Sequence, residues 1–281
     1  MAEIDSDSAD EPELGRTVRA AFRASREGNR VIIKPGELIE ARYAKGLSPS
    51  LPARKVLALL IAKAGGDAGA AGRTHKVTKK ELRGSHNSND RISGILDELM
   101  DLKFVMRTIS GRGREAILTS AVMSWNIEEK SEDGMSIIEW EFSEPAQQMF
   151  RGSDYFARIN KAALLSFRSK YALSIYEIGC LLVGRRDRTW RGTVDELREK
   201  LGVPEGTLAN FAQLRRSVLA KAQAEVNQLA HFEFTWNEFS RGGPGRRATC
   251  SARSSAAWCA AATASATSRP PSVCATPPMS P

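Results

Sequence analysis

The sequence predicts an α+β, mainly helical protein in which two compact units lie between disordered N- and C-terminal tails. Two observations indicate the units: apolar residues recur at helical spacing in several segments, and short alternating runs follow the last helix of each unit. The third observation is that both ends of the chain have few large apolar side chains. We therefore expect a disordered acidic leader over 1–29, folded units over 30–150 and 151–245, and a disordered tail over 246–281.

Composition and charge favour a soluble protein with an anionic partner. Hydrophobic residues make up 42% of the chain, and the net charge of +8 corresponds to a pI near 9.5. The first 14 residues hold six acidic side chains and no basic one, which is unlike a signal peptide. The longest apolar run, VLALLIAKA, is too short to span a bilayer. We expect a cytoplasmic location and no membrane partner.

The N-terminal unit has the pattern of a helix-turn-helix followed by a hairpin. A short helix is expected where Thr78 and Glu81 have the spacing of a capping box. After the next helix, Gly111 and Gly113 bracket Arg112 between two β-prone runs, as in a hairpin with a basic tip. The expected elements are helices at 52–64, 78–84 and 91–102, strands on both sides of GRGRE, and a further strand at 135–142.

The C-terminal unit repeats this plan. Thr193 and Glu196 again have capping-box spacing, and Pro204 with Gly206 marks the turn. The expected elements are two helices within 160–185, a helix at 193–203, a long helix at 207–229, and a strand in which Phe232, Phe234 and Trp236 share one face. Two helix-turn-helix units, each with a β wing, predict two tandem winged-helix domains, a fold that places one helix in the DNA major groove.

Candidate DNA contacts lie first on the long helix. At 100° per residue, the face opposite the apolar stripe carries Gln213, Arg216, Ser217 and Lys221, which supply hydrogen-bond donors toward a groove. Arg215 falls near the apolar side, so we interpret it as a member of a structural ion pair. The alternative, a solvated surface helix, remains open for Arg216 and Lys221, because such side chains are common on surfaces.

Further candidates belong to the N-terminal unit and to the last wing. Lys79, Lys80 and Arg91 lie in the helix-turn-helix, and Arg112 and Arg114 lie at the hairpin tip, where each is expected to contact phosphates. Arg241 follows the last expected strand and is added as a wing residue. The alternative is a solvated hairpin that points away from DNA.

The sequence does not predict an enzyme, a metal site or a cofactor. A metal-dependent nickase needs a histidine cluster and a nucleophilic tyrosine, but the three histidines are scattered. The segment GDAGAAGRT has the wrong spacing for a phosphate-binding loop and carries Arg in place of Lys. The four cysteines show no CxxC spacing, so neither zinc nor a disulfide framework is expected.

Three segments of the C-terminal half, FRSKYALSIYEI, VDELREKLGV and LRRSVLAKAQAEVNQLAHFEF, resemble the plasmid replication initiator proteins of the RepA/RepB type. Upstream, LPARKVLALLIAKA, HNSNDRISGILDELM and the GRGRE hairpin are similar to the same family, so the resemblance covers roughly residues 30–241.

The resemblance implies that the C-terminal winged helix reads repeats (iterons) in double-stranded DNA at a plasmid origin, while the N-terminal one contacts phosphates and supports dimerisation. It also implies origin opening with the host initiator and helicase, and repression of the protein's own promoter. The rival function is a transcriptional regulator with two winged helices and no role in origin melting.

The C-terminal tail departs from the family pattern. The family has a return strand after the last turn, whereas ATCSARSSAAWC and the proline-containing segment after it show no apolar alternation. We interpret the tail as a segment not evolved for the fold, produced by a shift of reading frame. On that hypothesis, a chain ending at Arg247 keeps its melting temperature and its DNA affinity.

Overall fold

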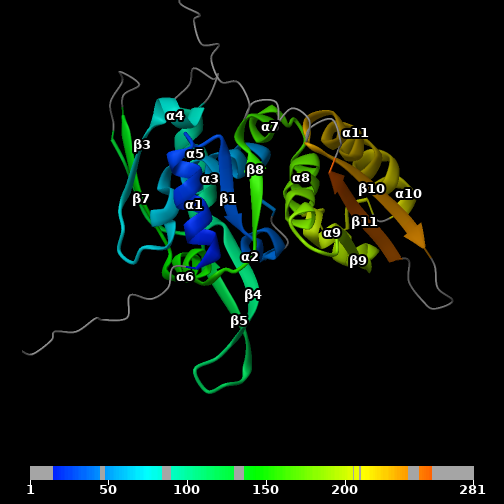
Figure 1. Ribbon diagram of the computed structural model, residues 1–281, viewed down its shortest axis with the longest axis horizontal. Coiled ribbons are helices and arrows are strands. Elements are labelled where there is room, and N and C mark those ends of the chain that lie inside the picture. The colour runs from blue at the N-terminus through cyan, green and yellow to red at the C-terminus, as the bar shows by residue number, and fades with distance from the viewer. Residues whose placement is uncertain are drawn as a thin grey trace, which may run out of the picture.

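The computed structural model describes residues 15–44, 48–83, 90–129, 136–204, 206–208, 210–239 and 247–254. Figure 1 shows two units side by side, with the N-terminal unit in blue to green and the C-terminal unit in yellow to orange. Helices contain more of the described residues than strands do, as predicted. None of the described helices is long and apolar enough to cross a membrane.

The N-terminal unit packs helices against three small antiparallel sheets, with strand orders β3-β7-β6, β2-β4-β5 and β1-β8. Its helices are α1 (Arg16–Arg26), α2 (Gly36–Glu40), α3 (Leu51–Ala64), the 3-10 helix η2 (Gly65–Gly69), α4 (Lys79–Arg83), α5 (Asp90–Asp101), α6 (Glu144–Gly152) and α7 (Lys161–Ser166). Its strands are β1 (Val31–Pro35), β2 (Arg42–Tyr43), β3 (His75–Thr78), β4 (Lys103–Ile109), β5 (Glu115–Ala121), β6 (Met123–Glu128), β7 (Ile137–Phe142) and β8 (Phe156–Asn160).

Helix α3, predicted as a helix over 52–64, forms the centre of this unit. It begins at a Ser50 cap, whose hydroxyl accepts a hydrogen bond from the Ala53 amide at 3.2 Å, and Pro52 lies in its first turn. The helix is buried over most of its length because α5, β1 and β3 pack around it. The short helix α4 begins with the predicted capping box, in which Thr78 and Glu81 bond each other's amides.

The leader expected over 1–29 is partly wrong. Residues 16–26 form helix α1, which packs on η2 and β1 with Val18, Ala21 and Ala24 buried. The Thr17 hydroxyl anchors it by donating to the Ser153 carbonyl at 2.6 Å. The buried stripe consists mainly of small residues, so the hydrophobic pattern of the sequence does not reveal it. Residues 1–14 lie outside the described residues, and disorder there stays a prediction.

The boundary expected between 150 and 151 is also wrong, because it cuts a sheet. Strand β8 pairs antiparallel with β1 from Val31↔Asn160 to Pro35↔Phe156. The next long helix, α8 (Lys170–Val183), packs against β8, α2 and α3 on one side and against elements of the C-terminal unit on the other. The two units therefore share α8, and no linker separates them there.

The C-terminal unit contains the remaining helices and one sheet of order β10-β11-β9. Its elements after α8 are β9 (Thr189–Thr193), α9 (Val194–Leu201), α10 (Phe211–Leu214), the π-helical turn η3 (Arg215–Leu219), α11 (Ala220–Leu229), β10 (Phe232–Phe239) and β11 (Arg247–Ser254). Helix α9 begins with the predicted Thr193–Glu196 capping box and ends at Gly202, whose φ of 67° is left-handed.

The long helix begins four residues later than predicted. Leu208 has a φ of 50°, which no helix accommodates, and the Asn210 side chain then accepts a hydrogen bond from the Ala212 amide at 2.9 Å. The helix therefore begins at Phe211, not at residue 207. From there α10, η3 and α11 run without a break to Leu229.

The predicted absence of a return strand is wrong. Strand β11 pairs with β10 from Phe232↔Ser254 to Phe239↔Arg247, and with β9 along its other edge. Its inward side chains are Ala248, Cys250 and Ala252, all buried. The alternation is present, but the inward residues are small, because Phe234, which pairs with Ala252, and the nearby Phe232 already fill the core. The expectation that the tail does not pack thus fails for 247–254. Residues 255–281 lie outside the described residues, and the shift of reading frame stays a hypothesis.

Candidate nucleic-acid interface

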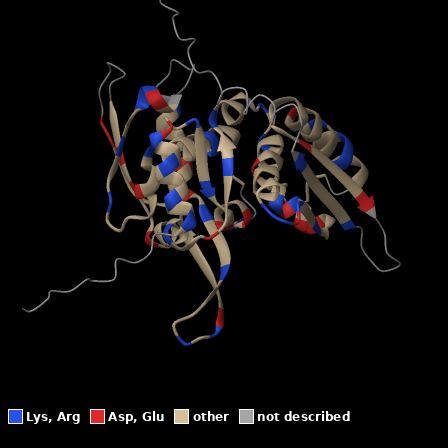
Figure 2. Ribbon diagram, viewed as in Figure 1, with Lys and Arg blue, Asp and Glu red and all other residues tan. Residues whose placement is uncertain are grey.

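The helix formed by α10, η3 and α11 presents the predicted contact face. Gln213, Arg216, Ser217 and Lys221 are all exposed, and so are the small residues Ala220 and Ala224. Figure 2 shows Lys and Arg on this helix, at the outer side of the C-terminal unit. Glu225 is the one acidic side chain of the helix, and its carboxylate accepts a hydrogen bond from the Arg168 amide at 2.5 Å. The face is therefore basic and narrow enough for a groove.

Arg215 does not occupy the position that the sequence predicts. It is exposed, and the structure shows no ion pair for it among the described residues. The cause is local geometry: the π-helical turn η3 widens the helix between Leu214 and Leu219, so the 100° spacing does not hold there. Arg215 thereby adds a cation beside Arg216.

The C-terminal end of this helix is fixed directly to strand β10. The Asn227 side chain accepts a hydrogen bond from the Phe234 amide at 2.7 Å and donates to the Phe234 carbonyl at 3.2 Å. Gln223 donates to the same carbonyl at 3.2 Å. These bonds hold the helix on the wing without a glycine or proline between them, and so give the helix a fixed direction relative to the strand.

Strand β10 in turn packs on α8. The rings of Tyr176 and Phe232 are stacked, with centroids 5.9 Å apart and planes 7° apart. Phe211, in the first turn of the long helix, lies edge-on to Trp236 at 6.4 Å. Aromatic contacts at the start and in the middle of β10 thus position the exposed face of the helix.

The candidate contacts of the N-terminal unit do not form one site. Lys80 and Arg91 are exposed on α4 and α5, and Arg112 and Arg114 are exposed at the tip of the β4–β5 hairpin. In Figure 1 that tip points away from α4 and forms the lowest part of the described fold. Arg241 lies outside the described residues.

Lys79 does not fit its predicted role as a phosphate contact. Its side chain is buried and forms an ion pair with Glu128 on β6. The same carboxylate also accepts a hydrogen bond from the Ser93 hydroxyl at 2.5 Å, so Lys79 joins α4 to α5 and to the sheet. Helical spacing does not predict this burial. Position 79 is buried because the strand alternation of His75 and Val77 in β3 continues into the first turn of α4.

Helix α5, which has the place of the reading helix in the N-terminal unit, has an acidic exposed surface. Its exposed residues include Asp97 and Asp101, and Arg91 is the one exposed base among its residues. Glu98 on the same helix holds the preceding loop, since its carboxylate accepts hydrogen bonds from the Ser50 amide at 2.6 Å and the Ser50 hydroxyl at 2.7 Å. A surface of this charge repels phosphates.

Two basic residues that sequence reasoning missed lie on the wings. Arg107 is exposed on β4, on the same face as Ile109. Arg247 is exposed at the start of β11. The signal for Arg107 was its alternation with buried Phe104 and half-buried Met106, and the signal for Arg247 was the small-residue alternation that follows it.

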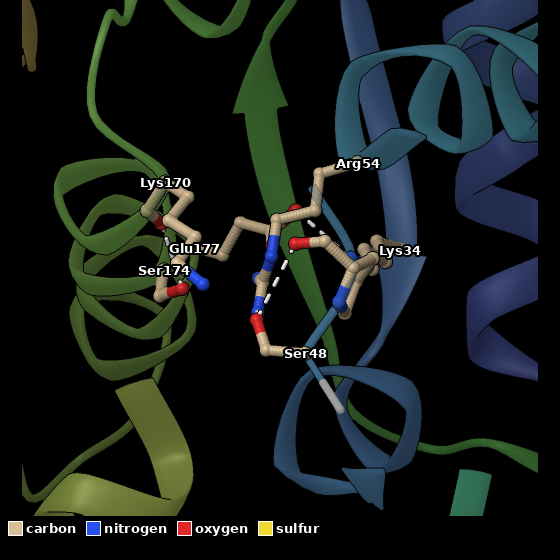
Figure 3. A network of polar contacts seen from close by, with 7 residues as sticks. Lys34, Ser48, Arg54, Lys170, Ser174 and Glu177 are labelled. Atoms are coloured by element: carbon tan, nitrogen blue, oxygen red, sulfur yellow. Dashed lines mark hydrogen bonds and ion pairs between the residues drawn. The ribbon is translucent and has the colours of Figure 1, made fainter. Parts of the chain in front are cut away.

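A buried polar network joins the two units (Figure 3). Glu177 on α8 pairs with the Lys34 ammonium of β1 at 2.8 Å and with the Arg54 guanidinium of α3 at 3.4 Å. All three side chains are at most 5% exposed. Arg54 also donates to the Ser48 hydroxyl at 3.4 Å. Removing one member would leave buried charge without a partner, so the network holds α8 in one position on the N-terminal unit.

Lys170, near this network, responds to its charge. Burial, and then the positive charge of Arg54, lowers the pKa of Lys170, and the nearby Glu98 carboxylate opposes this. Two more pairs lie around the same junction: the exposed pair of Arg42 with Glu199 at 3.1 Å, and the half-buried pair of Arg185 with Glu40 at 3.0 Å. The junction between the units is therefore held by ion pairs of both kinds, buried and exposed.

Comparison with known proteins accounts for most of the described fold. The family described as Initiator Replication protein matches in two segments, its WH1 domain over residues 31–180 and its WH2 domain over residues 193–247. No curated protein matches the chain. Among solved structures, domains 2–3 of RctB align at 13% identity with a TM-score of 0.40, over 72% of this chain and 81% of that one.

The order of the two matches agrees with the two helix-turn-helix units and their wings, and α8 falls at the end of the first match. The resemblance to plasmid replication initiators is confirmed, and so is the prediction of two tandem winged-helix domains. A match over more than half of the chain by its first domain alone leaves one conclusion: this chain belongs to the Initiator Replication protein family.

Proposed function

We propose that this replication initiator binds repeats in the origin DNA of a plasmid, with the helix α10–η3–α11 in the major groove as the base-reading element. The observation that carries the proposal is the exposed face of that helix, which offers Gln213, Arg216 and Lys221 without an exposed acid between them. Arg and Gln side chains make the bidentate contacts that distinguish bases in the major groove.

The N-terminal domain supplies sequence-independent affinity in this proposal. Arg112 and Arg114 at its hairpin tip, with Lys80 and Arg91 at its other end, are positioned for phosphates on different stretches of DNA. The protein acts by binding and not by catalysis, in the cytoplasm, where it helps to open the origin and recruits the host initiator and helicase. As a dimer it represses its own promoter.

The test is DNA binding by Arg216→Ala at fixed salt. Footprinting upstream of the gene first identifies the site, and affinities are then measured for that site and for a scrambled duplex. If Arg216 reads a guanine, the variant loses about 1–3 kcal/mol on the specific site and little on the scrambled one. Arg23→Ala, an exposed change on α1, is the matched control. An equal loss on both duplexes would make Arg216 a phosphate contact.

The second candidate, a transcriptional regulator without origin melting, shares all of these contacts. It is favoured if the footprint covers a single operator and not tandem repeats. Repeats spaced by about two DNA turns, with permanganate-reactive bases beside them when the protein is bound, support the initiator.

A further inference from the structure

The β4–β5 hairpin extends beyond the body of the N-terminal domain (Figure 1). At its base, Tyr43 and Arg42 of β2 pair with Phe104 and Val105, and Phe104 is buried. Met106 and Leu118 pack on the edge of the core. From Arg107 to Ile117 the two strands pair with each other alone among the described elements. The distal half of the hairpin is therefore a free two-stranded arm.

The tip of this arm is built to one shape. The Gly113 amide donates to the Ser110 carbonyl at 2.8 Å, and Gly113 has a φ of 74°, which favours glycine. The Ser110 amide then donates to the Arg114 carbonyl at 2.8 Å, and the Ser110 hydroxyl accepts from the Arg114 amide at 3.2 Å. This is a type I turn closed by a left-handed glycine, and it presents Arg112 and Arg114 on a narrow tip.

One face of the arm carries the two most exposed large apolar side chains of the described residues, Ile109 at 64% and Ile117 at 74%. Ile117 lies opposite Arg107 in the register, and Ile109 lies opposite Glu115, so the two isoleucines are diagonal neighbours on the same face. Paired apolar side chains this exposed mark a surface that is covered when a partner binds.

Charge around the isoleucines indicates which partner covers them. The arm that carries the two isoleucines also carries three exposed cations, Arg107, Arg112 and Arg114, and Glu115 is its exposed acid. A second copy of the arm would bring these cations together, which costs energy, whereas a polyanion neutralises them. Arg beside β-branched apolar side chains on a slender ribbon matches the arms that enter the minor groove and insert apolar wedges between base steps.

We propose that the β4–β5 arm enters the minor groove of duplex DNA, where Ile109 and Ile117 wedge into a base step and Arg112 and Arg114 lie along the groove. This inference rests on the proposed function, because the C-terminal domain delivers the arm to the origin. The arm unstacks and kinks the duplex there. Deformation costs least at TA and CA steps and in A·T-rich DNA, so the wedge site lies in such a stretch beside the repeats.

The experiment uses the full chain and a series of duplexes that contain the footprinted site. Each duplex carries 2-aminopurine at a different position of the flanking DNA, and its fluorescence rises where the base unstacks. The double variant Ile109→Thr/Ile117→Thr keeps β-branched side chains on the strands while shortening both wedges. Ile127→Thr on β6, another isoleucine that is 57% exposed, is the matched control.

The expected result is a local fluorescence rise and a DNA bend with the natural protein and with Ile127→Thr, and the loss of both with the double variant, which still binds the repeats. Netropsin, which fills the A·T minor groove, abolishes the rise in the same way. A rise that survives the double substitution or netropsin overturns the proposal.

Two further outcomes separate this inference from the function it rests on. Specific binding by the natural protein without any unstacking overturns the wedge and leaves the proposed function standing, whereas no specific binding to any origin duplex means that the proposed function itself fails. The double variant could also change the sedimentation of the free protein and leave the rise in 2-aminopurine fluorescence intact. In that case the isoleucines form a contact between two copies of the protein, and the proposed insertion into DNA is wrong.

Discussion

Helices α5 and α10–η3–α11 hold the same place in their respective winged-helix domains, yet their exposed surfaces carry opposite charge. The exposed residues of α5 include Asp97 and Asp101, and its Glu98 is engaged by Ser50. The long helix exposes Arg215, Arg216 and Lys221, and its single acid holds the Arg168 amide. One fold thus carries one helix with a basic exposed face and one helix whose exposed face is mainly acidic.

The difference teaches that contact chemistry, and not the fold, assigns the tasks of the two domains. In the C-terminal domain the exposed cations lie on the long helix, and the wing supports that helix through the hydrogen bonds of Asn227 with Phe234. In the N-terminal domain the cations lie on the hairpin tip and at the end near α4, while the helix between them packs and positions.

Among the changes that test this contrast, the loss of strand β11 is expected to have the largest effect on stability and on DNA binding. A chain stopped after Arg246 lacks the strand that lies between β10 and β9, and uncovers Phe232 and Phe234. Two phenylalanines that lose their cover cost about 3–6 kcal/mol in the free energy of unfolding. We expect a lower Tm and loss of specific DNA binding. A chain stopped after Ser254 is the control and keeps both; equal Tm values for the two chains would show that β11 does not pack.

The next largest effect is expected at the junction between the two domains, where the buried network of Glu177, Lys34 and Arg54 lies. Glu177→Ala leaves Lys34 and Arg54 buried without their carboxylate, which costs about 3–5 kcal/mol. Urea unfolding measures this loss. Glu199→Ala removes the exposed pair with Arg42 and is expected to cost about 0–1 kcal/mol. Similar losses for the two variants would mean that burial does not strengthen the network.

A smaller effect tests the acidic surface of α5 directly. Asp97→Asn with Asp101→Asn removes two exposed negative charges. If α5 lies near DNA but repels it, affinity for the scrambled duplex rises by about two- to fivefold at low salt. The control is the same measurement at high salt, where the gain disappears. Unchanged affinity at low salt would place α5 away from the DNA.

The smallest expected effect is a pH dependence of stability at helix α4. Helices α4 and α9 begin with matching Thr–Glu capping boxes, but they differ in the charges around the glutamate. In α4 the Lys63 ammonium, at 2.8 Å, and then the Thr78 amide lower the pKa of Glu81 to about 2. Since the folded-state pKa is depressed, this stabilisation is present above the unfolded value and is lost as pH falls from about 5 to 2.

Glu81→Gln therefore lowers the free energy of unfolding by less than about 1 kcal/mol at pH 6, because the pair is exposed, and the difference from the natural protein closes by pH 2. Urea unfolding across that range measures it, with Glu144→Gln, an exposed acid in the first turn of α6, as the control. A gap that stays constant with pH would assign the effect to the backbone cap alone.

Much of the fold could be predicted because its signals are local. Both capping boxes, the GRGRE turn and the apolar stripe of α3 depend on residues close in sequence, and all form as predicted. What failed depends on partners far along the chain. Helix α1 and strand β11 bury small residues against large ones elsewhere, so their own side chains give no hydrophobic pattern from which the elements could be predicted.

The candidate site divides in the same way. Exposure of Gln213, Arg216, Ser217 and Lys221 follows from helical spacing and is confirmed, while their contacts with bases stay a prediction. The burial of Lys79 by Glu128 and the exposure of Arg215 depend on a distant strand and on a π-helical turn. Helical spacing rules assume a regular helix and take no account of a neighbouring sheet, so they predict neither the burial of Lys79 nor the exposure of Arg215.

Helix α8 also limits how this protein can exchange parts with its relatives. Adjacent residues on it serve different domains, because Tyr176 stacks on Phe232 of the C-terminal wing and Glu177 enters the Lys34–Arg54 network. A recombination crossover on either side of α8 would join a helix fitted to one parent with a core from the other. Viable hybrids between such initiators are therefore expected to inherit α8 together with the matching residues of both domains.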